Sequence, residues 1–116
     1  ATVAQDGAGG GDGATPGHGH ASRPIEDIRL AFERNKGAIY ALYTRALRVD
    51  PSLHGKVVVE LTITPGGQVS AARIVSSELH DDELERKLLA RIRLFEFGAR
   101  AVEPLILTWP LDFLPA

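Results

Sequence analysis

The fold of this chain is decided by residues 55–67, which read GKVVVELTITPGG. The apolar side chains of this stretch recur at every second position, at Val57, Val59, Leu61 and Ile63. A period of two is typical of a strand with one buried face. Pro65-Gly66-Gly67 then supplies a turn, because glycine readily takes positive φ. The sequence therefore predicts a β-hairpin whose return strand covers Val69–Ser77.

Helical patterns flank the hairpin on both sides. Before it, apolar residues from Ile28 onward recur at helical spacing, and Asp50-Pro51 ends the pattern, which predicts a helix starting near Ile25. Ser22 is expected to cap this helix, with Pro24 in its first turn. Gly37 lies in its interior and is expected to split it or to permit close packing.

A second helix is predicted after the hairpin. Asp81 or Asp82 can cap it, and Phe97-Gly98 is expected to end it. Its apolar residues at helical spacing are Leu84, Leu88, Leu89, Ile92 and Phe95.

The last segment, Leu105–Leu114, alternates again and predicts a third strand. Its odd-numbered apolar residues, with Trp109 among them, are expected to face the core. Pro110 lacks an N–H, which favours a sheet edge. The predicted fold is α+β in the order α-β-β-α-β. Two helices pack on one face of a three-stranded antiparallel sheet of order 2-1-3, with strands counted along the chain.

The composition divides the chain of 116 residues into two parts. Seven of the 12 glycines fall in residues 1–24, a stretch that has no Leu, Ile, Phe, Tyr or Trp. Such a stretch buries too little apolar surface to offset the entropy of ordering, so it is interpreted as a disordered Gly-rich linker. Residues 25–116 are expected to form one small domain.

Charge and cysteine content limit the classes of partner. Lys plus Arg is 13 and Asp plus Glu is 15, a balance that gives no support for nucleic-acid binding. Without cysteine there is no disulfide or thiolate-metal site. With no apolar run of about 18 residues, no membrane-spanning segment is expected in this sequence. A basic cluster is interpreted as a solvated helix face and consists of Arg86, Lys87, Arg91, Arg93 and Arg100.

No enzyme signature stands out, so neither catalysis nor a cofactor is expected. Ser76, Ser77 and His80 are close in sequence but imply no nucleophile-base geometry. The acidic residues from Asp81 to Glu85 are expected to stabilise a helix start rather than bind metal. Gly17-His18-Gly19-His20 is interpreted as polar linker.

Function is therefore expected at a surface, and the edge of the last strand is the leading candidate. An edge strand offers unpaired N–H and C=O groups to an extended peptide. The pattern alone leaves open whether this edge binds a partner or is only protected from aggregation. A strand-swapped homodimer is also possible at such an edge. The residues expected to pair with a partner are Ile106, Leu107, Thr108, Trp109, Pro110 and Leu111.

Several motifs together resemble the C-terminal domain of TonB-type proteins. They are Ala46-Leu47-Arg48-Val49, Gly55-Lys56-Val57-x-Val59, Thr64-Pro65-x-Gly67-x-Val69, Ile74-Val75-Ser76-Ser77 and the pair Phe95 and Phe97. A closer likeness is to the AgmX/PglI gliding-motility branch. Its features are Lys36-Gly37, Tyr43, Asp50-Pro51-x-Leu53-x-Gly55, Leu84-Glu85 and Trp109-Pro110-Leu111-x-Phe113, so the resemblance covers about residues 29 to 113.

The resemblance implies a periplasmic module of an inner-membrane-anchored protein. Such a module binds an outer-membrane transporter or another envelope protein segment by strand addition, and transmits force from a proton-driven motor. Residues 1–24 would then be the distal end of a tether, with any anchor upstream of Ala1. The alternative is a structural adaptor in a gliding-motility or envelope-trafficking machine, with a protein partner that is not a transporter.

Overall fold

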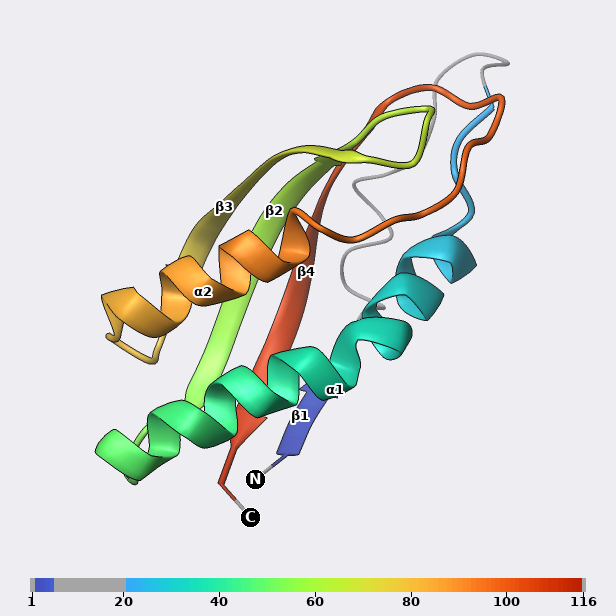
Figure 1. Cartoon of the computed structure of the whole chain (residues 1–116). Coiled ribbons are helices and arrows are strands. Elements are labelled where there is room, and N and C mark those ends of the chain that lie inside the picture. Colours follow the sequence, from blue (N-terminus) through green and yellow to red (C-terminus); the bar gives the residue numbers. More distant parts are fainter. Residues whose placement is uncertain (1, 6–20, 116) are drawn as a thin grey trace.

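The computed structural model of the protein describes residues 2–5 and 21–115. A four-stranded antiparallel sheet has the order β1-β4-β2-β3, and both helices cover one of its faces (Figure 1). Along the chain the elements are β1 (Thr2–Gln5), α1 (Ile25–Val49), β2 (Gly55–Ile63), β3 (Val69–Ser77), α2 (Asp82–Ile92) and β4 (Leu105–Leu114).

The predicted α+β fold and the order of its three main strands are confirmed. β2 is central, with β3 on one side and β4 on the other. The β2–β4 register runs without a shift from Gly55 opposite Phe113 to Ile63 opposite Leu105. The crossover through α2 returns the chain to the far side of β2, as the order of elements predicts.

The core lies between the sheet and the helices. The alternating apolar rows of β2 and β4 are buried, and Trp109 is only 1% exposed, which confirms its expected place. Its ring stacks on Phe32 of α1 at a centroid distance of 5.0 Å, and Phe95 meets Phe32 edge-on at 4.9 Å. Each such buried side chain contributes about 1.5–3 kcal/mol, so these rings fix α1 against β4.

Helix α1 is continuous, and two expectations about it are wrong. Its N-cap is Pro24, with no side-chain cap, so Ser22 does not cap it and Pro24 precedes the first turn. Gly37 neither splits the helix nor permits close packing, because a Cβ built there has no neighbour within 4 Å. Near the other end, the buried Tyr43 hydroxyl donates to the Leu53 carbonyl at 2.6 Å, and burial raises the pKa of Tyr43.

Helix α2 ends earlier than Phe97-Gly98, the end that its periodicity predicts. Asp81 caps its start by accepting a hydrogen bond from the Leu84 N–H at 3.0 Å, and the helix ends at Ile92. The chain then leaves helical geometry, which lets the Phe97 N–H donate to the Gly67 carbonyl at 2.8 Å. Phe95 and Phe97 are buried from the segment after the helix, and Phe95, three residues after Ile92, continues the helical spacing without belonging to α2.

The first 24 residues contain structure that the linker interpretation did not include. Thr2–Gln5 form β1, which pairs with the last four residues of β4. Arg23 is only 3% exposed, so packing begins before residue 25. Residues 6–20, with Gly17-His18-Gly19-His20 among them, lie outside the described residues, and the prediction of disorder there stays a prediction.

Candidate functional site: the free edge of β4

Strand β4 has two parts that differ on the side away from β2. Leu111–Leu114 pair with β1, in a register that places Gln5 opposite Leu111 and Thr2 opposite Leu114. Leu105–Pro110 pair with no second strand among the described residues, and we call this part the free edge of β4. Within residues 2–5 and 21–115, the prediction that the last strand lies at a sheet edge therefore holds for Leu105–Pro110 and is wrong for Leu111–Leu114.

The ladder indicates which backbone groups face outward on the free edge. Both backbone groups of Lys56 point toward the β3 side. Its N–H donates to Glu78 Oε1 at 2.6 Å, and its C=O accepts from the Glu78 N–H at 2.9 Å. Since backbone groups alternate in direction along a strand, the neighbouring odd-numbered residues of β2 face β4. The odd-numbered residues of β4 lie opposite them and face β2. The even-numbered residues of β4 thus present their backbone groups to the free side.

The free edge therefore offers the N–H and C=O of Ile106, the N–H and C=O of Thr108, and the C=O of Pro110. Pro110 occupies an outward position, where its missing N–H costs the β2–β4 ladder nothing. Ile106 is 60% exposed and Thr108 is exposed. Among the described residues these groups have no strand partner, and such a row is the arrangement that accepts an added strand.

The structure divides the six predicted pairing residues into two sets. Leu107, Trp109 and Leu111 bury their side chains in the core and use their backbone toward β2. Ile106, Thr108 and Pro110 are the three that face the free side. The sequence pattern predicts which side chains are buried, but a proposal for backbone pairing also needs the hydrogen-bond direction, which comes from the ladder.

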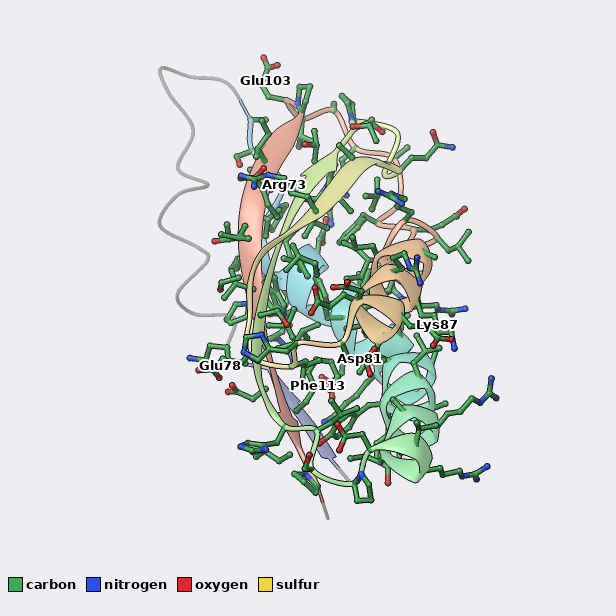
Figure 2. The ribbon with its side chains drawn as sticks, turned by 90° about the vertical axis from the view of Figure 1, so that its left-hand side faces the viewer. Arg73, Glu78, Asp81, Lys87, Glu103 and Phe113 are labelled. Atoms are coloured by element: carbon green, nitrogen blue, oxygen red, sulfur yellow. The ribbon has the colours of Figure 1, made fainter. Side chains whose placement is uncertain are left out.

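The sheet face opposite the helices is uncovered in the described residues (Figure 2). Arg73 of β3 lies on this face and forms an ion pair with Glu60 of β2 at 2.9 Å, whereas Phe113 lies between the sheet and α1. Ile106 is on the Arg73 side as well, since it is opposite Thr62, two residues from Glu60 on the same strand. A strand added at the free edge would extend both faces.

The other edge of the sheet, β3, is less regular. Its pairing with β2 shifts register twice, between Val58 and Val59 and between Thr62 and Ile63. Arg93, which follows α2, donates to the Ala72 carbonyl at 3.1 Å. Gln68, just before β3, forms an isolated bridge with Glu96. Bulges and covering groups are the usual protection of an edge strand, so β3 is a poorer template than β4.

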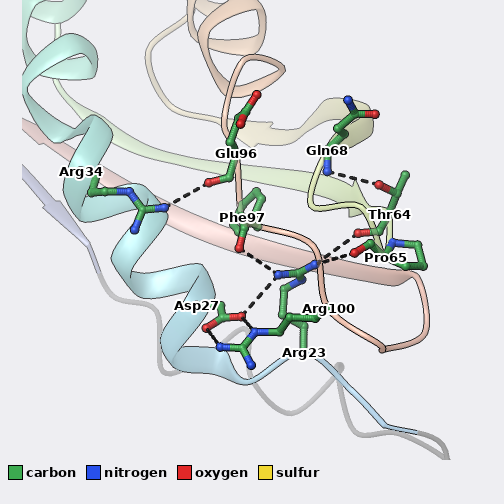
Figure 3. Close-up of polar contacts among 9 residues, drawn as sticks. All are labelled: Arg23, Asp27, Arg34, Thr64, Pro65, Gln68, Glu96, Phe97 and Arg100. Carbon is green, nitrogen blue, oxygen red and sulfur yellow. Dashed lines mark hydrogen bonds and ion pairs between the residues drawn. The ribbon is translucent and has the colours of Figure 1, made fainter.

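The buried side chain of Arg23 connects three segments near the β2–β3 turn (Figure 3). The Arg23 guanidinium donates to the carbonyls of Phe97 at 3.0 Å, Thr64 at 3.3 Å and Pro65 at 3.5 Å, and pairs with Asp27 at 3.3 Å. Arg100 pairs with the same carboxylate. Arg23 thus joins the start of α1, the β2–β3 turn and the segment after α2. Its contacts are internal, so it is a structural residue and not a ligand site.

The other residues singled out in the sequence also have structural contacts. In the basic cluster, Lys87 pairs with Glu83 at 3.1 Å and Arg91 donates to Asn35 at 3.0 Å. Ser77 Oγ accepts from the Leu79 N–H at 3.1 Å, and His54 Nδ1 lies 2.8 Å from the Ser52 carbonyl. Within residues 2–5 and 21–115, no group of three or more His, Asp or Glu side chains is placed to hold a metal ion. In the same residues, neither helix has the length and apolarity needed to cross a bilayer.

Comparisons with known proteins add no relative: no family model, curated protein or solved structure matches this chain.

Proposed function

We propose that this domain is a non-enzymatic binding module that takes an extended segment of another protein as an added strand on the free edge of β4. The observation that carries the proposal is the row of outward backbone groups on Ile106, Thr108 and Pro110. An added strand gains main-chain hydrogen bonds there, each worth about 0.5–1.5 kcal/mol net. The neighbouring side chains then decide which segment is preferred.

The contrast between the two edges supports the choice of β4. β3 is bulged and partly covered by Arg93, whereas the β2–β4 ladder is unbroken from Leu105 to Phe113. A partner strand laid on a regular ladder continues the twist of the sheet without first displacing a side chain. The free edge is therefore the part of the sheet that is ready for pairing.

The resemblance of the sequence motifs to TonB-type C-terminal domains gives this proposal a biological setting. We infer a periplasmic module whose parent protein is anchored in the inner membrane and transmits force from a proton-driven motor. Its partner would then be a peptide segment of an outer-membrane transporter. In the alternative, a gliding-motility or trafficking adaptor, the same edge would take a segment of a machine component.

The test is a titration of the full chain with synthetic peptides from candidate transporters and machine components, followed by backbone amide shifts. Peptide binding is expected to shift Ile106 and Thr108 most. The decisive variant is Thr108→Pro, which removes one outward N–H and leaves the β2–β4 hydrogen bonds in place. We expect it to weaken binding about 10- to 100-fold, since it leaves a partner carbonyl unpaired.

Thr108→Val is the matched control, because it alters the side chain and keeps the N–H. It should bind within about threefold of the unmodified chain. Shifts confined to the helices, or equal affinities of the proline and valine variants, would show that the partner does not add a strand to β4. Binding of a transporter peptide would favour the TonB-type function, and binding of a machine-component peptide would favour the gliding-motility or trafficking adaptor.

A further inference from the structure

The last part of the β4 edge is already occupied by the chain itself. Four residues of β1 lie antiparallel to Leu111–Leu114, on the side of β4 where the free edge lies. A partner strand that pairs with Leu105–Pro110 and continues along β4 would meet β1 at Leu111. The chain's own N-terminal strand and an outside strand therefore use the same row of backbone groups.

We propose that β1 is a displaceable resident strand that competes with the partner for the end of the β4 edge. This inference rests on the proposed function for its biological meaning, but the competition itself is a property of the chain. A partner limited to Leu105–Pro110 binds beside β1. A longer partner must first displace it.

The pairing is short enough to be reversible. Even-numbered residues of β4 face outward, so the two hydrogen-bonded pairs with β1 are Thr2 with Leu114 and Ala4 with Asp112. Two such pairs hold a segment weakly, and segments with few backbone hydrogen bonds open at low free-energy cost. By comparison, β2 pairs with β4 over nine positions. Loss of β1 leaves that main ladder in place.

β1 ends at Gln5, opposite Leu111, and the sequence that follows it does not favour a strand. Beyond Gln5 the chain reads DGAGGGDG, residues 6–13, and both Gly and Asp are disfavoured in strands. Because β1 is tethered to the domain, it competes at an effective concentration on the order of millimolar. An outside strand takes Leu111–Leu114 only if it binds strongly enough to outcompete β1 at this effective concentration. This favours partners that pair over the whole edge.

The ladder also provides matched variants and internal reporters. Ala4→Pro removes an N–H that faces β4 and bonds to it. Val3→Pro removes an N–H that faces away from β4, so it serves as the control. The amides of Asp112 and Leu114 face β1 and report its presence. Those of Leu111 and Phe113 face β2 and report the integrity of the main sheet.

The experiment is amide hydrogen exchange on the full chain and the two variants. We expect exchange at Asp112 and Leu114 to rise about tenfold or more in Ala4→Pro, with Leu111 and Phe113 unchanged, and Val3→Pro to resemble the unmodified chain. An acetylated and amidated peptide of residues 1–6 should then shift Asp112 and Leu114 in Ala4→Pro, and much less in the unmodified chain at the same concentration.

Equal exchange at Asp112 and Leu114 in Ala4→Pro and the unmodified chain would overturn the inference. So would a residue 1–6 peptide that fails to shift these amides once β1 is disrupted. Neither measurement uses an outside partner. A negative result for β1 can therefore be told apart from a negative result in the peptide titration at Ile106 and Thr108. Binding at those two residues with β1 undisturbed in every variant would keep the proposed function and remove the competition.

Discussion

The β3 and β4 edges of the sheet differ in how regular they are and in how much of their backbone is covered. At β3, two register shifts and the Arg93 side chain on the Ala72 carbonyl interrupt the row of groups that another chain could use. At β4, the ladder is regular, and its outer side pairs with β1 along Leu111–Leu114 and with no other strand in the described part of the chain. Exposure alone therefore does not define a binding edge. Among the described residues, a regular ladder without a covering side chain distinguishes β4 from β3.

The protection of β3 comes mainly from the segment that follows α2. Arg93, Glu96 and Phe97 all contact β3 or the turn that precedes it, and the Gly67 backbone lies directly against Gly98. This segment is also where the sequence pattern predicted that the helix would continue. Changes that disturb it should make β3 resemble β4, whereas changes on the free edge of β4 should leave stability nearly intact.

The largest effect is expected from Gly67→Ala. Gly67 has φ of 88°, and a Cβ built there lies 2.5 Å from the backbone N and O of Gly98. Left-handed strain and a clash with backbone together predict a loss of about 3 kcal/mol in the free energy of unfolding, measured by urea denaturation. Gly66→Ala is the control, since its Cβ meets only Thr64 Oγ1 at 3.6 Å. Similar losses in both variants would contradict the proposed packing of the turn.

Arg23→Met should have the next largest effect. The Arg23 side chain is 1% exposed, and its guanidinium hydrogen-bonds to three carbonyls that methionine cannot satisfy. We expect a loss of about 2 kcal/mol in unfolding free energy. Arg100→Met is the comparison, because that side chain is half exposed and pairs with Asp27 alone, so its loss should be about 0.5 kcal/mol. An Arg23→Met chain as stable as Arg100→Met would refute the tie between α1 and the turn.

The smallest effect on stability, and the most direct test of the contrast, is Arg93→Ala. It removes the donor to the Ala72 carbonyl, which should cost about 0.5–1 kcal/mol because the contact is only partly buried. The uncovered edge should increase self-association, measured by sedimentation at rising protein concentration. Arg86→Ala removes an equal charge from α2, the helix that Arg93 follows, and should leave both quantities unchanged. If both variants associate equally, charge and not edge protection is the cause.

Much of the fold follows from the sequence because the strongest patterns coincide with the core. The bounds of Val69–Ser77 and Leu105–Leu114 are as predicted, and the alternation of β2 and β4 correctly assigns the buried faces. The predicted end of α2 was wrong because Phe95, three residues after Ile92, continues the helical spacing although tertiary contacts beyond the helix bury it. β1 was missed because four residues within a Gly-rich stretch carry too little pattern to indicate a strand.

The candidate site was predicted only in part for a related reason. Alternation places Ile106 and Thr108 outward as side chains, and Pro110 indicates an edge. The direction of each backbone N–H depends on the hydrogen-bond pattern of the sheet, which is visible only in the structure, for example in the bonds between Lys56 and Glu78 on the far side of β2. The occupation of Leu111–Leu114 by β1 depends on contacts between the two ends of the chain. Neither is encoded in the local pattern of residues 105–114.

The stack of Trp109 on Phe32 has a practical consequence. Trp109 is the one tryptophan in the sequence, and it lies in β4 between two residues that face the free edge. Its indole emission therefore comes from a single site, beneath α1 and beside the groups that an added strand would use. The protein thus carries an intrinsic fluorescent probe, which allows binding and unfolding to be followed without a label.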